Sequence, residues 1–163
     1  MLSKIYGKNL DINIVEKKKV CYNNLNIQKG EVDTLKPEEL NGATLAYIGD
    51  AVLEIMVRCK VIESGFTNAG KLNDLARDFV KATEQSKVID NIIDLLEEDE
   101  MMFFKRGKNA KVNHPKSATA IEYSRATGLE ALFAYLYMNG KQERLEYLFE
   151  TAYKEHINKI LNK

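Results

Sequence analysis

The sequence predicts one all-α helical bundle preceded by a short irregular extension. The chain has 163 residues, of which 45% are apolar and 29% charged, a composition typical of a single domain with its own core. Only two prolines and nine glycines occur, which disfavours turn-rich sandwiches and barrels. From Pro37 onward, apolar residues recur at helical spacing. Together these observations favour a helical bundle over residues 35–163.

Residues 1–34 have a different character from the rest of the chain. They combine a run of three lysines at 17–19, two asparagines at 23–24 and scattered β-branched residues. We interpret this part as an irregular extension, with one short strand expected at about Asn13 to Tyr22.

Capping signals divide the bundle into helices. Pro37 and the two acids after it are typical of a first helical turn. Asn41 is a candidate N-cap for a long helix through Glu63, which Gly65 would end. The remaining expected helices begin at Thr67 or Asn68 (to Val80), Thr83 (to about Leu96), Glu97 (to Arg106), Ser117 (to Asn139) and Lys141 (to Leu161), with a loop at 107–116.

Charge and cysteine content exclude several classes of protein. Lys+Arg and Asp+Glu are equal at 24 each, so the whole surface cannot coat a polyanion, although a local basic patch can. Two cysteines cannot build a disulfide framework. The longest apolar run, Ala131 to Met138, is far below the roughly 20 residues of a membrane span. The first residues lack a signal peptide's apolar stretch, so we expect a soluble cytoplasmic protein with no membrane partner.

Two acids stand in unusually apolar helices. Asp50 follows Gly49 within Leu45 to Val57, and Glu130 lies within Gly128 to Tyr137. A helix that is apolar on all sides is normally buried, and burying an ionised carboxylate without a partner costs several kcal/mol. Gly49 would let a neighbouring helix approach the acid closely.

Three explanations of these acids remain open from the residues alone. A cation that prefers oxygen ligands, such as Mg²⁺, can lie between them. Alternatively, each acid pairs with a basic residue such as Arg58, Arg125 or a lysine, which is the commoner outcome. Asp50 can also point into solvent through a gap between helices.

Residues 101–121 form a basic segment that contains no acid. Asn109 and Ser117 add hydrogen-bond donors, and Gly107 would let backbone N–H groups approach a ligand. The segment predicts phosphate binding, or else a solvated loop that balances the acids at 97–100. The candidate phosphate-contacting residues are Lys105, Arg106, Lys108, Asn109, Lys111 and Lys116.

Three motifs resemble a known family. The segment LAYIGDAV (45–52) is similar to the signature helix of ribonuclease III catalytic domains, and LEAL (129–132) to their second acidic helix. KRGKNAK (105–111), followed by Pro115 and Lys116, resembles the Mini-III branch, which consists of the catalytic domain without a double-stranded-RNA-binding domain.

The resemblance implies a homodimeric, Mg²⁺-dependent endonuclease for double-stranded RNA. By position, Asp50 and Glu130 would be its catalytic, metal-binding acids, and the loop at 105–116 would grip RNA. The signature helix would also form much of the dimer interface. The family further suggests maturation of the large-subunit ribosomal RNA precursor, with a ribosomal protein bound to that RNA as a candidate partner.

Two departures from the family pattern reduce the expected ligand set. Full-length members carry a third acid one turn before the aspartate, where this chain has Ala46, and a fourth three residues before the glutamate, where it has Thr127. Water and substrate phosphate oxygens would complete the coordination of Mg²⁺. The rival hypotheses are a non-catalytic double-stranded-RNA-binding helical dimer and a helical protein-interaction scaffold.

Overall fold

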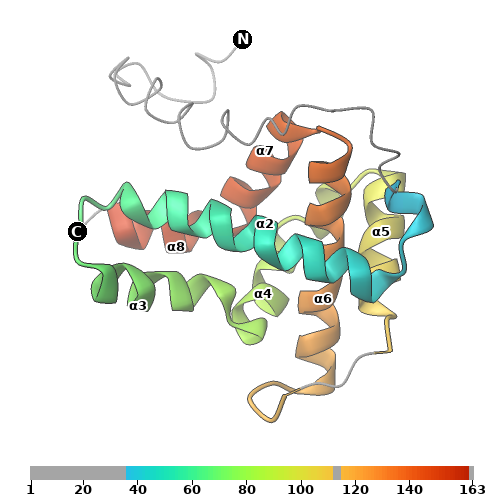
Figure 1. Ribbon diagram of the computed structural model, residues 1–163, viewed down its shortest axis with the longest axis horizontal. Coiled ribbons are helices and arrows are strands. Elements are labelled where there is room, and N and C mark those ends of the chain that lie inside the picture. The colour runs from blue at the N-terminus through green and yellow to red at the C-terminus, as the bar shows by residue number, and fades with distance from the viewer. Residues whose placement is uncertain (1–35, 112–114, 162–163) are drawn as a thin grey trace. The chain divides into compact units, whose positions relative to one another are not determined.

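The computed structural model describes residues 36–111 and 115–161 (Figure 1). Contacts within the chain separate the unit Leu35–Lys163 from residues 1–34, and every described residue belongs to this unit. The strand expected at 13–22 and the part of the basic segment at 112–114 lie outside the described residues.

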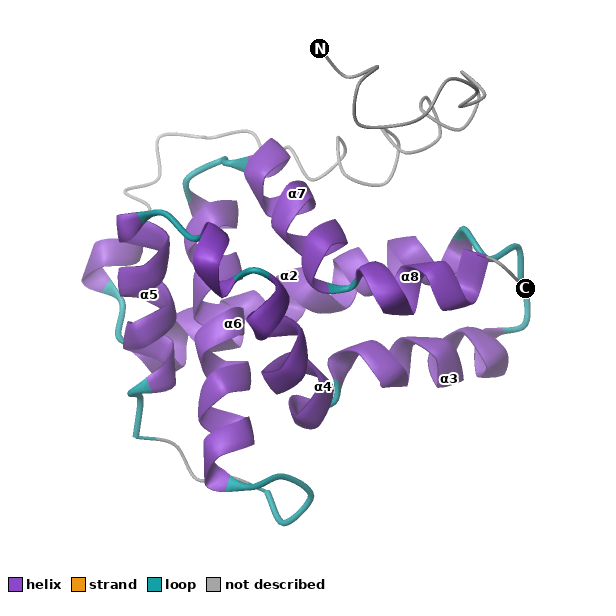
Figure 2. Cartoon of the chain, turned by 180° about the vertical axis from the view of Figure 1, so that it is seen from behind, coloured by secondary structure: helices purple, strands orange, loops and turns teal. Residues whose placement is uncertain are grey.

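The described chain is built from helices joined by loops, and no strand occurs within it (Figure 2). This confirms the all-α prediction. No described helix is long and apolar enough to cross a membrane. The elements are η2 (Pro37–Glu39), α2 (Gly42–Ile62), α3 (Ala69–Val80), α4 (Ala82–Val88), η3 (Ile89–Asn91), η4 (Ile93–Leu95), α5 (Glu98–Lys108), α6 (Ala120–Met138), α7 (Gln142–Ala152) and α8 (Lys154–Leu161).

The first helix ends follow the sequence signals. The Asn41 side chain accepts a hydrogen bond from the Thr44 N–H at 2.9 Å and begins α2. Gly65 leaves the helix with a φ of 81°, a conformation that favours glycine. Asn68, rather than Thr67, caps α3 by accepting from the Lys71 N–H at 3.1 Å.

Two expected helices are each broken, and tertiary contacts explain both breaks. The helix expected at 83–96 becomes α4 and two 3₁₀ turns, where the Asn91 side chain donates to the Ala152 carbonyl. The helix expected at 141–161 breaks at Tyr153, whose ring is fully buried and stacks on Phe79. The Tyr153 hydroxyl also donates to the Phe79 carbonyl, so this one residue joins three helices.

Helix α6 lies at the centre and packs against α2, α5 and α4 (Figure 1). Glycines allow the close approach of these helices. A Cβ at Gly107 would lie 2.5 Å from the Thr127 carbonyl oxygen and 2.5 Å from the Ala131 Cβ, both on α6. The expected loop therefore begins after Lys108, because Gly107 is buried inside α5 against α6. The prediction that this glycine exposes backbone N–H groups to a ligand is wrong.

Candidate active site

The crossing of α2 over α6 brings Asp50 and Glu130 together, although 80 residues separate them along the chain. The contact is made by Gly49, where a Cβ would lie 1.7 Å from the backbone oxygen of Glu130. Any side chain at position 49 would force the two helices apart. Gly49 therefore fixes the closeness of the two acids through the backbone.

Burial and nearby negative charge raise the free energy of the ionised form of both carboxyl groups. Burial raises the pKa of Glu130 to about 8, with the nearby negative charge of Asp50 as the second cause. The pKa of Asp50 is also raised, first by desolvation and then by the carboxylate of Glu54. Both acids thus lie in surroundings that lack compensating positive charge.

The basic residues proposed as partners of these acids are bound elsewhere. Arg58 pairs with Glu54 at 2.8 Å on the surface of α2. Arg125 pairs with Asp90 and donates to the Ser86 carbonyl. Within residues 36–111 and 115–161, no salt bridge involves Asp50 or Glu130, so the ion-pair explanation with Arg58 or Arg125 is wrong.

The donor set suits a hard divalent cation. Two carboxylates converge, and Gln85 contributes a side-chain amide beside Glu130. Oxygen donors of this kind are those that Mg²⁺ prefers, and Mg²⁺ commonly keeps several water ligands. The positions of the two missing acids are occupied by Ala46 and Thr127, which are both buried, and the Thr127 hydroxyl donates to the Tyr123 carbonyl. In the described part of the chain, no three histidine, cysteine, aspartate or glutamate residues form a metal-binding group.

The outer face of α2 is more exposed than its composition predicts. Asp50 is exposed, and Tyr47, Ile55 and Ile62 have exposed fractions of 82%, 40% and 57%. Ile55 and Ile62 lie on the same side of α2 as Tyr47, and Tyr47 lies about one turn before Asp50. Helix α2 is therefore not completely buried within one subunit. Glu130 on α6, by contrast, is half-buried.

The candidate RNA-contacting residues are divided between helix and loop. Lys105 and Lys108 are exposed in the last turns of α5, Asn109 caps it, and Lys111 and Lys116 are exposed beyond it. Arg106 is held differently. Its Nη1 donates to the carbonyls of Pro37, Glu38 and Leu40 at 3.0–3.4 Å, which anchors η2.

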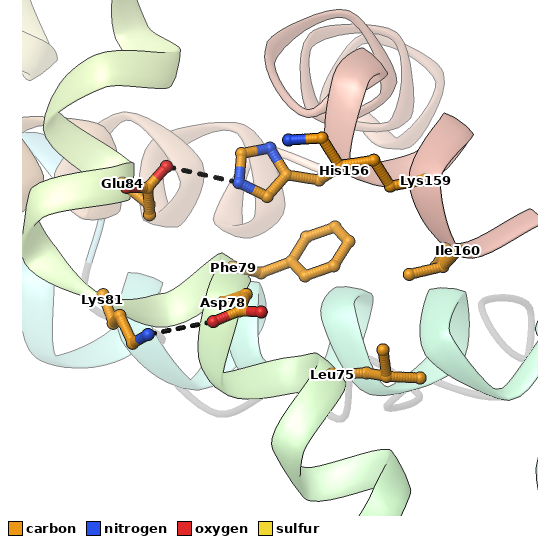
Figure 3. A pocket seen from close by; sticks show the side chains of 8 residues that line it. All are labelled: Leu75, Asp78, Phe79, Lys81, Glu84, His156, Lys159 and Ile160. Carbon is orange, nitrogen blue, oxygen red and sulfur yellow. Dashed lines mark hydrogen bonds and ion pairs between the residues drawn. The ribbon is translucent and has the colours of Figure 1, made fainter.

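A pocket between α3, α4 and α8 is a weaker candidate site (Figure 3). Its acids already have partners: Asp78 pairs with Lys81, Glu84 pairs with Lys87, and His156 Nε2 lies 3.4 Å from the Glu84 carboxylate. Charges that are already paired leave little electrostatic attraction for a ligand. Asp50 and Glu130, which form no salt bridge within the described residues, make the crossing of α2 and α6 the stronger candidate site. The pocket is lined by Leu75, Asp78, Phe79, Lys81, Glu84, His156, Lys159 and Ile160.

Gln85 is the residue of this site that the sequence analysis missed. It lies on α4 and is 1% exposed. A signal for it existed, because Gln85 precedes Val88, Ile89 and Ile92 at helical spacing and so belongs to their inward face. An amide among apolar residues on a buried face needs hydrogen-bond partners.

Residues 43–141 match the ribonuclease III domain model. The match covers more than half of the chain, and the fold and the acid pair agree with it. The chain therefore belongs to the ribonuclease III family and is an endoribonuclease.

Within that family, the chain groups with the Mini-ribonuclease 3 proteins. It is 41% identical to the Mini-ribonuclease 3 of Desulfitobacterium hafniense over 113 residues, which is 69% of this chain and 72% of that protein. It is 40% identical to that of Symbiobacterium thermophilum, over 71% of this chain and 90% of that protein. The crystal structure of a Fusobacterium nucleatum protein is similar, with a TM-score of 0.69, 31% identity and coverage of 74% of this chain and 94% of that one.

Proposed function

We propose that this endoribonuclease cleaves double-stranded RNA with Mg²⁺ held by Asp50 and Glu130. The observation that carries the proposal is the acid pair itself. Two carboxylates meet at a helix crossing, and within the described residues no basic side chain forms a salt bridge with either of them. Burial and the negative charge of Asp50 raise the pKa of Glu130 to about 8. A divalent cation between them would remove the repulsion that the fold otherwise maintains.

The chain's own residues would hold and orient the reacting groups. Asp50, exposed on α2, would face both the cation and the substrate, whereas the half-buried Glu130 would bind the cation from the inner side. Mg²⁺ held there by Asp50 and Glu130 would supply Lewis acidity, which would activate a water and offset negative charge on the phosphate. We expect products with a 5′-phosphate and a 3′-hydroxyl.

The basic segment is proposed to bind the RNA backbone. Lys105, Lys108, Lys111 and Lys116 carry exposed positive charge near the end of α5 and beyond it. Asn109 and Arg106 belong to the same proposed surface, with Arg106 also anchoring η2. Such contacts recognise the shape and charge of an A-form duplex rather than its sequence.

A homodimer is proposed from the outer face of α2. Tyr47, Ile55 and Ile62 present an apolar surface on α2 that a second copy would cover. Two copies would then supply one cleavage site for each strand of a duplex. Sedimentation of the purified protein tests this: a dimer supports the proposal, and a monomer at micromolar concentration contradicts it.

The cellular substrate is proposed to be the precursor of large-subunit ribosomal RNA, cut in the cytoplasm. The proposal rests on the relationship to Mini-ribonuclease 3 proteins, and a ribosomal protein bound to the RNA is the proposed helper. Accumulation of unprocessed precursor in cells that lack the protein is the expected result, and normal processing would contradict it.

The direct test of the proposed function is Asp50→Asn. The substitution keeps the shape of the side chain but removes a ligand charge, so cleavage of a duplex in Mg²⁺ should fall by about a thousandfold or more while duplex binding persists. Asp74→Asn is the matched control, because Asp74 is exposed and pairs with Arg77 on α3. Unchanged cleavage by the Asp50 variant, or no cleavage by the wild type, would contradict the proposal.

A further inference from the structure

Gln85 is a buried polar residue placed against the acid pair. It is 1% exposed on α4, and α4 packs directly on α6, the helix that carries Glu130. Its neighbours on the inward face, Val88 and Ile89, are buried apolar side chains. A glutamine costs more to bury there than a leucine or methionine of similar size would.

The Gln85 side chain makes a hydrogen bond to the Glu130 carboxyl group, and this contact lowers the pKa of Glu130 against the effects of burial and of Asp50. A contact that lowers the pKa of an acid favours its ionised form. A carboxylate can only accept hydrogen bonds, so the Gln85 amide N–H is the donor. The amide therefore fixes the orientation of the Glu130 carboxylate at the helix crossing.

The other end of the same amide has no partner. The Oε1 atom of Gln85 is the one buried side-chain nitrogen or oxygen within the described residues that makes no hydrogen bond to the protein. Buried polar atoms are nearly always hydrogen-bonded, to protein or to ordered water. Since the N–H end of the amide contacts Glu130, Oε1 lies close to the same carboxylate and can accept from a donor beside it.

We propose that Gln85 is a positioning residue for the metal site: its amide N–H orients the Glu130 carboxylate, and its Oε1 accepts a hydrogen bond from a water molecule bound to the divalent cation. The inference rests on the proposed function, because it requires a cation at Asp50 and Glu130. It explains why a glutamine occupies a buried position where an apolar residue would pack as well.

The test is Gln85→Met, which keeps the size of the side chain but removes both the donor and the acceptor. Mn²⁺ serves as the probe, and its binding to the RNA-free protein is measured by electron paramagnetic resonance. We expect the Mn²⁺ affinity to fall about 10- to 100-fold, as when an outer hydrogen-bond partner of a metal site is removed. The Tm of the metal-free variant should stay within about 4 °C of wild type, since the lost hydrogen bond is offset by removal of the unpartnered oxygen.

Ser86→Ala is the matched control. Ser86 is the adjacent buried polar residue on α4, and the contact it makes with Arg125 uses its backbone carbonyl, which the substitution keeps. We expect its Mn²⁺ affinity to equal that of the wild type. If Gln85→Met does not fold, Gln85→Asn is measured by the same criterion, because the shorter side chain withdraws the amide from Glu130.

The outcomes separate this inference from the proposed function. Wild-type Mn²⁺ affinity in the folded Gln85 variant, with binding lost in Glu130→Gln, would overturn the role of Gln85 and leave the metal site standing. Equal Mn²⁺ binding by the wild type and Glu130→Gln would overturn both. Weakened binding in the Gln85 variant, unchanged in Ser86→Ala, supports the inference.

Discussion

Glu100 and Glu130 are both buried or half-buried glutamates in the helices α5 and α6, yet their carboxyl groups behave in opposite ways. Burial raises the pKa of Glu100, but hydrogen bonds from Arg144 and from the Glu97 backbone outweigh it and hold that pKa below its ordinary value. Arg144 binds both carboxylate oxygens, at 2.9 Å and 2.7 Å. Glu130 has no such cation among the described residues, and its pKa rises to about 8.

The difference separates a structural acid from a candidate functional one. Glu100 is fully buried, and it also closes the start of α5 by accepting from the Glu97 N–H. Its negative charge is therefore fully compensated by groups within the fold. The charge of Glu130 is partly satisfied by a neutral amide and opposed by Asp50. Retention of an acid in surroundings that disfavour its charge is typical of sites that bind a cation.

The largest expected contrast is in stability without metal. Arg144→Met leaves Glu100 charged and buried without its cation, so the free energy of unfolding should fall by about 3–5 kcal/mol.

Glu130→Gln removes an acid whose charge is disfavoured in the fold, so the free energy of unfolding of the metal-free protein at pH 7 should rise by about 2–4 kcal/mol. Urea unfolding in EDTA measures both changes. Arg77→Met is the control, because its pair with Asp74 is exposed and is expected to contribute about 1 kcal/mol or less. Destabilisation by Glu130→Gln would break the comparison.

The pH dependence of stability follows from the same acid. The pKa of Glu130 is raised from about 4.5 in the unfolded chain to about 8 in the fold, so between these values the native state holds a proton that the unfolded state has lost. Stability without metal should therefore fall as the pH rises from about 5 to 8, by roughly a few kcal/mol. Thermal melts in EDTA across this range measure the fall, and Mg²⁺ should reduce it. A fall of the same size in Glu130→Gln would assign it to other groups.

The smallest expected effect concerns the basic surface. Replacing Lys108 and Lys111 with alanine should weaken duplex binding and lower the slope of log affinity against log salt by about 1 for each lysine that contacts a phosphate. Filter binding of a duplex by the Asp50→Asn protein, which does not cut, measures both quantities. Lys71→Ala is the control, since Lys71 lies over the Phe66 ring near the start of α3. Unchanged affinity and slope would mean that these lysines are only solvated.

The sequence predicted the helices where local chemistry determines them. Asn41, Gly65 and Asn68 end or begin helices through their own side chains or backbone conformation, and each does so in the structure. The breaks after Val88 and at Tyr153 were not predictable in the same way. They depend on which distant residues bury Ile92 and the Tyr153 ring, and a helical period carries no record of that.

The candidate site was predicted only in part for a related reason. Spacing singled out Asp50 and Glu130 but could not show that they meet, because the contact depends on Gly49 lying against the Glu130 backbone. Gly107 was misinterpreted because a glycine that permits helix packing looks the same in sequence as one that opens a loop. Gln85 was missed because helical spacing can place an amide on a buried face but cannot show which groups it contacts or that its oxygen lacks a partner there.

A crystal of the full chain grown with Mn²⁺ tests most directly whether the two acids share a cation. We predict an anomalous difference peak that is bound by carboxylate oxygens of both Asp50 and Glu130, at metal–oxygen distances of about 2.0–2.3 Å. The result that would contradict the metal site is density for both side chains, turned apart or paired with a lysine or arginine, and no peak between them.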